Sequence, residues 1–154
     1  MKYILTLLIP LFVLNKYQQI HELELGKYLP SDVKIIDSSK YRFRVTSGGR
    51  SEDVITIMYK TIEYDVAFDG NKKIKYLFTN DMDFQTKEGI STRNNYKKIK
   101  RFEKGLKIFE PDFGYLVRLP SGWIALFADQ KVLSAGKVND SSKISAFIKK
   151  QLPF

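Results

Sequence analysis

Apolar and polar side chains alternate between residues 41 and 78, a pattern typical of β-strands that bury one face. Tyr41–Val45 alternates with arginine, and further strands are predicted at Val54–Tyr59, Ile62–Phe68 and Ile74–Phe78. The turn sequence Asp69–Lys72 between the last two strands predicts a hairpin. If both of its strands bury the same face, the opposed positions are 68:74, 66:76 and 64:78.

A second hairpin is predicted later in the chain, around the short turn Pro120–Gly122. Its strands are Tyr115–Leu119 and Trp123–Phe127, and the opposed positions are 119:123, 117:125 and 115:127. A loop of this length favours glycine in the left-handed conformation at its last position, which Gly122 supplies. The two hairpins together predict an antiparallel sheet.

Between the hairpins the apolar spacing changes to that of a helix. Arg93–Glu103 is predicted to be an amphipathic helix, with Ser91 or Thr92 as its N-cap and Gly105 as its end. A second helix is predicted at Lys143–Leu152, although the part from Ile144 to Ile148 fits a last strand equally well. The expected fold class is therefore α+β: an antiparallel sheet built of hairpins, with one central basic amphipathic helix and a C-terminal helix.

The chain opens with the layout of a secretory signal peptide. Lys2 precedes the uncharged apolar run Tyr3–Leu14, which is too short to cross a bilayer and is followed by a polar segment. We therefore expect a signal peptide at 1–19, whose cleavage site lacks the usual small residues, and a single α+β domain at 20–154. The expected location is periplasmic or secreted. An uncleaved anchor and an N-terminal strand or helix in the core remain alternatives, and no transmembrane span is expected elsewhere.

The composition argues against several kinds of chemistry. The 154 residues include no cysteine and one histidine, which excludes disulfides, cysteine-based metal sites and histidine-pair metal sites. His21 lies near the expected mature N-terminus, where a general base would lack a rigid setting. Asp81 and Asp83 resemble the start of a calcium loop but lack its later glycine and glutamate. No catalytic residue, metal or cofactor is expected, and the chain is predicted not to be an enzyme.

The net charge of +9 is concentrated in one stretch of the chain. Between residues 91 and 109 there are seven lysines and arginines against a single glutamate. On the predicted helix, the cations gather opposite the apolar side and form a candidate binding face: Arg93, Lys97, Lys100, Arg101 and Lys104. Such a face can attract anionic partners. The alternative interpretation is that these cations form an ordinary solvated helix face with no binding role.

Several short segments carry a resemblance to known folds. They are Glu88–Lys100, Gly105–Ile108, Asp112–Tyr115, Ser121–Trp123 and Asn139–Ile144. Their order resembles small exported bacterial proteins in which a helix precedes an antiparallel sheet. That layout is similar to the fold shared by small outer-membrane lipoproteins and the β-lactamase-inhibitor protein. The resemblance implies a role in protein–protein contact.

The sequence therefore predicts an exported, non-enzymatic binding module whose partner is another protein, with an inhibitor or immunity-type role as its concrete form. The alternative is an envelope-associated module that binds an anionic lipid or glycan through the same basic face. A hydrolase is the third possibility and would require facing carboxylates in a cleft. Nucleic acid is an improbable partner for an exported protein.

Overall fold

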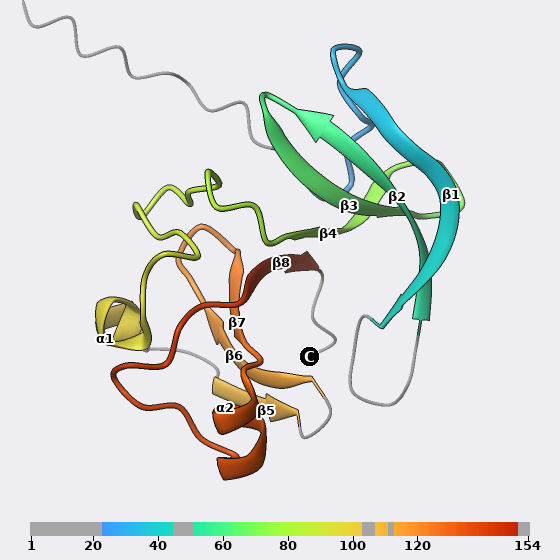
Figure 1. Ribbon diagram of the computed structural model, residues 1–154. Coiled ribbons are helices and arrows are strands. Elements are labelled where there is room, and N and C mark those ends of the chain that lie inside the picture. Colours follow the sequence, from blue (N-terminus) through green and yellow to red (C-terminus); the bar gives the residue numbers. More distant parts are fainter. Residues whose placement is uncertain (1–22, 45–50, 103–106, 111–112, 151–154) are drawn as a thin grey trace, which may run out of the picture.

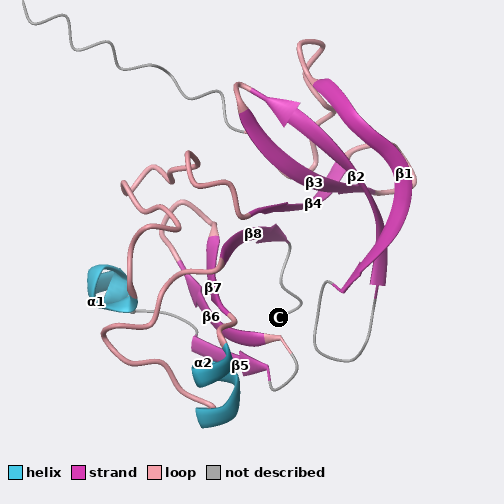
Figure 2. Ribbon diagram, in the orientation of Figure 1, coloured by secondary structure: helices cyan, strands magenta, loops and turns pink. Residues whose placement is uncertain are grey.

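A computed structural model describes residues 23–44, 51–102, 107–110 and 113–150 (Figure 1). Strands make up most of its regular structure (Figure 2). In chain order the elements are β1 (Lys34–Arg44), β2 (Ser51–Tyr59), β3 (Ile62–Phe68), β4 (Ile74–Thr79), α1 (Tyr96–Ile99), the 3₁₀ helix η1 (Lys100–Phe102), β5 (Lys107–Glu110), β6 (Gly114–Arg118), β7 (Ile124–Phe127), α2 (Gln130–Ala135) and β8 (Ala146–Lys150).

All the described strands belong to one antiparallel sheet, in the order β1-β2-β3-β4-β8-β7-β6-β5. The first four strands form one meander and β5–β7 form another. The last strand, β8, lies between them and pairs with both β4 and β7 (Figure 1). The antiparallel sheet is confirmed, but the helices are short, so the fold is mostly β and the predicted α+β class is supported only loosely.

The predicted C-terminal helix at Lys143–Leu152 is wrong for the described residues. The alternative, a last strand in this part of the chain, is confirmed by β8. Ala146, Phe147 and Ile148 are consecutive and all buried, because β8 is a central strand with apolar packing on both faces. Phe147 belongs to one buried cluster and Ile148 to the other. A run of neighbouring apolar residues, together with Ile144, gives the spacing of an amphipathic helix without forming one.

Two apolar clusters are associated with the sheet. The larger contains Trp123, Phe127 and Phe147 together with Phe84 and Ile90 from the loop after β4. Phe84 covers the sheet there, with its ring 4.7 Å from that of Trp123 and 5.1 Å from that of Phe147, measured between centroids. The second cluster contains side chains that alternate with the first along the same strands: Ala67, Tyr76, Leu116, Ile124, Leu126, Ala146 and Ile148.

This burial of both faces accounts for an error in the first predicted hairpin. The pair Phe68 and Ile74 is confirmed, but a bulge follows, and Ala67 lies opposite Tyr76. The predicted pairs 66:76 and 64:78 are therefore wrong, since positions 66 and 65 lie opposite Leu77 and Phe78. Where both faces are apolar, alternation no longer specifies the register.

The second hairpin has the predicted register. Tyr115 lies opposite Phe127, and Val117 lies opposite Ala125. The Leu119 N–H donates to the Trp123 carbonyl oxygen at 2.7 Å, which closes the turn. Gly122 has φ +84°, the left-handed conformation expected at this position.

The differences from the sequence prediction include the start of β1 and the presence of α2. β1 begins at Lys34, well before the predicted strand at Tyr41. α2 was not predicted, although Asp129 caps it by accepting a hydrogen bond from the Val132 N–H at 2.8 Å and Gly136 ends it with φ +60°.

The predicted signal peptide at 1–19 lies outside the described residues. Among those residues, no helix is long and apolar enough to span a membrane.

Candidate functional site

The predicted basic helix exists as a shorter element than expected. α1 covers Tyr96–Ile99, and η1 continues it to Phe102. Tyr96 and Ile99 are buried, and the Tyr96 ring meets the Phe127 ring edge-on with centroids 5.7 Å apart. These two side chains seat the helix on the larger apolar cluster and leave its cations pointing away from it.

The predicted start of this helix is wrong. Neither Ser91 nor Thr92 is the N-cap; that position belongs to Asn95, whose side chain makes no capping hydrogen bond. Instead, the Ser91 N–H donates to Oδ1 of Asn94 at 2.9 Å. Asparagine side chains that bond to nearby backbone compete with helix formation, so the chain before Tyr96 stays irregular. The predicted end at Gly105 lies outside the described residues.

The loop before β8 holds α1 in place. The Tyr96 N–H donates to the Ser142 carbonyl at 2.8 Å, and the Lys97 N–H donates to the Asp140 carbonyl at 3.2 Å. Asn95 and Lys143 form an isolated antiparallel bridge. The first N–H groups of the helix are therefore satisfied by protein carbonyls rather than open to an anion.

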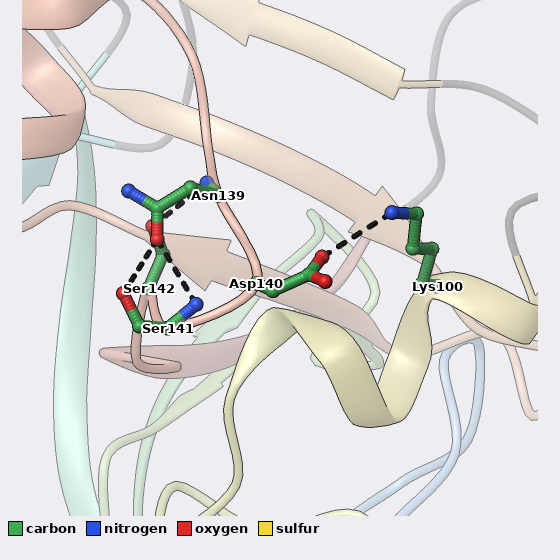
Figure 3. A network of polar contacts seen from close by, with 5 residues as sticks. All are labelled: Lys100, Asn139, Asp140, Ser141 and Ser142. Atoms are coloured by element: carbon green, nitrogen blue, oxygen red, sulfur yellow. Dashed lines mark hydrogen bonds and ion pairs between the residues drawn. The ribbon is translucent and has the colours of Figure 1, made fainter.

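The same loop is ordered by its own side chains (Figure 3). Asn139 Oδ1 accepts hydrogen bonds from the Ser141 N–H at 2.9 Å and the Ser141 hydroxyl at 2.6 Å. Asp140 points the other way and pairs with Lys100, with Oδ1 3.3 Å from Nζ. The loop thus supports α1 through its backbone and neutralises one of the predicted cations.

The five predicted cations have different surroundings. Arg93 lies before the helix and pairs with Asp83 at 3.1 Å, while Lys100 pairs with Asp140. Lys97 and Arg101 are exposed, and the Arg101 guanidinium lies 4.8 Å from the centre of the Phe102 ring. Lys104 lies outside the described residues. Exposed ion pairs of this kind contribute about 0–1 kcal/mol, so they reduce the free charge without locking the side chains.

Two further cations belong to this region and were not predicted. Lys98 is exposed, although a longer helix would have turned it away from the predicted face. Lys143 is exposed and is brought beside the helix by its backbone bridge to Asn95. The closely spaced lysines at 97, 98 and 100 signal the first of these cations, Lys98. No local pattern signals Lys143. We call the exposed set the α1 surface: Lys97, Lys98, Lys100, Arg101 and Lys143.

The loop that leads to α1 is attached to the β6–β7 turn by Glu88. Its Oε1 accepts a short hydrogen bond from the Ser121 N–H. Partial burial raises the pKa of Glu88, but the nearby side chains of Thr86 and Ser121 and the backbone N–H groups of Glu88 and Ser121 favour the charged carboxylate more strongly. The net pKa lies below the ordinary 4.5. The ionised carboxylate therefore favours the folded chain.

We expect Glu88→Gln to make the stability of the protein less dependent on acid. Because folding lowers the Glu88 pKa, its contribution is present above the ordinary pKa and is lost as the pH falls through the folded-state value. Urea unfolding at several pH values should show a smaller decrease below about pH 4.5 in the variant than in the wild type. Equal decreases in both proteins would mean that Glu88 does not stabilise the fold through its charge.

Asp81 and Asp83, which resemble the start of a calcium loop in sequence, have structural partners. Asp81 accepts hydrogen bonds from the Glu63 N–H at 3.0 Å and the Asp83 N–H at 2.8 Å. Asp83 pairs with Arg93. Within the described ranges, histidine, aspartate and glutamate side chains form no group of three that could hold a metal ion. His21 lies outside those ranges.

Comparison with known proteins adds no relative: no family model, curated protein or solved structure matches this chain. The resemblance to small outer-membrane lipoproteins and the β-lactamase-inhibitor protein therefore stays a prediction.

Proposed function

We propose that this chain is an exported, non-enzymatic binding module that contacts an acidic protein partner, as an inhibitor or immunity-type protein does. The observation that carries the proposal is the α1 surface, where several exposed cations project from a helix held in one position. Export rests on the apolar leader of the sequence.

The setting of the helix supports binding rather than simple solvation. Its apolar side is buried through Tyr96 and Ile99, and its N–H groups are bonded to the loop before β8. A surface that is ordered before binding loses less conformational entropy when a partner docks. Because Arg93 and Lys100 already face Asp83 and Asp140, Lys97, Lys98 and Arg101 contribute most of the charge available to a partner.

The partner chemistry follows from the sign of this charge. A basic patch steers an acidic surface toward it and disfavours basic partners. Contacts at the edge of such an interface act mainly on the association rate, which falls as salt screens the charges. We therefore expect fast, salt-sensitive association with a protein whose docking surface is rich in aspartate and glutamate.

We expect the triple variant Lys97→Glu, Lys98→Glu and Arg101→Glu to lose at least about tenfold in recovery of acidic partners from an extract of the native host. The purified protein would be immobilised, and the bound proteins would be identified by mass spectrometry. The reason is that each substitution replaces attraction with repulsion at the point of contact. Circular dichroism should remain unchanged, since all three side chains are exposed.

A matched control carries the same change of net charge elsewhere. Lys72, Lys131 and Lys137 are exposed and lie on the β3–β4 turn and on or just after α2. Their triple substitution with glutamate should preserve recovery of the same partners. Equal losses in both triple variants would show that overall charge, rather than the α1 surface, governs binding.

An anionic lipid or glycan is the second candidate, favoured by the close spacing of Lys97, Lys98, Lys100 and Arg101 along the chain. Polyanions respond to charge density more than to shape, so this candidate predicts retention on heparin and on anionic vesicles that decreases steeply with salt. Retention that both triple variants lose equally would mark it as a non-specific charge effect.

A further inference from the structure

The edge strand β1 offers an interaction surface distinct from the α1 surface. β1 is the first strand of the sheet and pairs only with β2 among the described strands. It has 11 residues, whereas β5 at the opposite edge has 4. Proteins commonly protect sheet edges by keeping the edge strand short. β5 follows that rule and β1 does not.

The beginning of β1 is exposed and partly apolar. All residues from Lys34 to Ser38 are exposed, and the exposed fractions of Ile35 and Ile36 are 55% and 45%. Large apolar side chains with this much exposure are few in the described chain, and the other two, Tyr28 and Met82, stand apart from one another in the sequence. Two adjacent exposed isoleucines on an edge strand are therefore candidates for contact with another chain.

The pairing of β1 with β2 is interrupted at this point. Ile35 lies opposite Ile57 and Asp37 lies opposite Thr56, so Ile36 has no counterpart on β2. A bulge leaves its extra residue outside the ladder and twists the strand. A second irregularity follows between Asp37 and Tyr41. Because these irregularities lie within and directly after Lys34–Asp37, β2 holds this part of β1 less regularly than it holds the rest of the strand.

The order of charges in this segment is self-complementary. When two antiparallel copies of Lys34–Asp37 are centred between Ile35 and Ile36, each Lys34 lies opposite an Asp37 and each Ile35 lies opposite an Ile36. Opposite charges and apolar side chains that lie directly across two antiparallel strands stabilise the pairing of those strands. A two-fold axis repeats every contact and closes the assembly at two chains.

We propose that β1 pairs with β1 of a second copy of this chain through Lys34–Asp37, which joins the two sheets edge to edge. The short segment makes the dimer weak and reversible, with a Kd of about 0.1 mM. The net charge of +9 on each chain opposes association, but salt at about 0.15 M screens charges beyond about 8 Å. The cross-strand ion pairs lie well within that distance.

The test is a charge swap followed by sedimentation equilibrium at increasing protein concentration in about 0.15 M salt. The wild type should form dimers, and Asp37→Lys, which places two lysines opposite each other, should weaken dimerisation about tenfold. The double variant Lys34→Asp and Asp37→Lys restores opposite charges and should return to within about threefold of the wild type. Because both variants alter Asp37 identically, any loss of its contacts within the chain affects both.

A separate variant tests whether a new surface charge alone disrupts association. Met82, with an exposed fraction of 67%, lies outside β1, so Met82→Lys should leave dimerisation unchanged. A wild type that stays monomeric up to about 1 mM overturns the proposal. So do assemblies that grow beyond two chains, or a double variant that dimerises no better than Asp37→Lys.

Discussion

Replacing Trp123 with alanine is expected to lower the free energy of unfolding by about 3–5 kcal/mol. Trp123 directly precedes β7 and is fully buried where the loop after β4 packs on the sheet. Its ring stacks on Tyr64 with centroids 6.5 Å apart and lies 4.7 Å from Phe84. The Lys149 ammonium lies 5.3 Å from the ring centre. Truncation removes all these contacts and leaves a cavity that neighbouring rings cannot fill.

Urea unfolding followed by circular dichroism would measure this loss. Tyr28→Ala is the control, because Tyr28 is an aromatic residue with an exposed fraction of 63%. Its removal should change the free energy of unfolding by less than about 0.5 kcal/mol. A Trp123→Ala protein as stable as the Tyr28→Ala protein would contradict the packing of the loop after β4 against the sheet.

The second large effect is expected at Gly114, the first residue of β6. Gly114 has φ +125°, and a Cβ there would lie 2.4 Å from the Phe127 carbonyl oxygen on β7. Gly114→Ala therefore combines an unfavourable backbone conformation with a clash against backbone that cannot move without breaking the β6–β7 pairing. We expect a loss of about 3 kcal/mol or more in the free energy of unfolding.

Two other glycines separate the contributions. Gly122 has φ +84° but open space around it, so Gly122→Ala should cost only the backbone strain, about 1 kcal/mol. Gly70 has open space and no positive φ, so Gly70→Ala should be close to neutral. Thermal unfolding should rank the three variants with Gly114→Ala the least stable and Gly70→Ala the most. A Gly114→Ala protein that unfolds like Gly122→Ala would contradict the close approach of β6 and β7.

The sequence predicts the second hairpin fully and the first only in part, for a physical reason. A three-residue turn ending in Gly122 restricts the register of β6 and β7 by itself. The register of the first hairpin was predicted from which face is buried, but Ala67 and Tyr76 are buried on the other face. The bulge between Ala67 and Phe68 has no signal in the alternation, so no pattern reveals it.

Central strands and short helices are difficult to distinguish from sequence for the same reason. The apolar positions of β8 are consecutive because that strand packs on both sides, and they mimic the spacing of a helix. Conversely, the region before α1 has helical spacing, but Asn94 bonds to the backbone of Ser91 and keeps it irregular. Within the predicted helix, Tyr96 and Ile99 are buried as expected, and Phe102 packs against the same apolar cluster.

The sequence predicts where the cations gather in the chain but not which of them are paired within the fold. The density of lysine and arginine around residue 100 predicts a basic surface near Lys97 and Arg101, which the structure leaves exposed. The partners of Arg93 and Lys100 come from two different loops, and Asp140 is 40 residues from Lys100. Such pairings depend on the fold as a whole, so composition alone does not reveal which cations are neutralised.

The most direct test of the proposed function is photo-crosslinking in the native host. A photoreactive amino acid would replace Lys97 on the α1 surface in one protein and Lys131 on α2 in another, since both positions are exposed. The account predicts a discrete adduct with an acidic protein from position 97 that position 131 does not give. The same adducts from both positions, or no adduct from position 97, would contradict it.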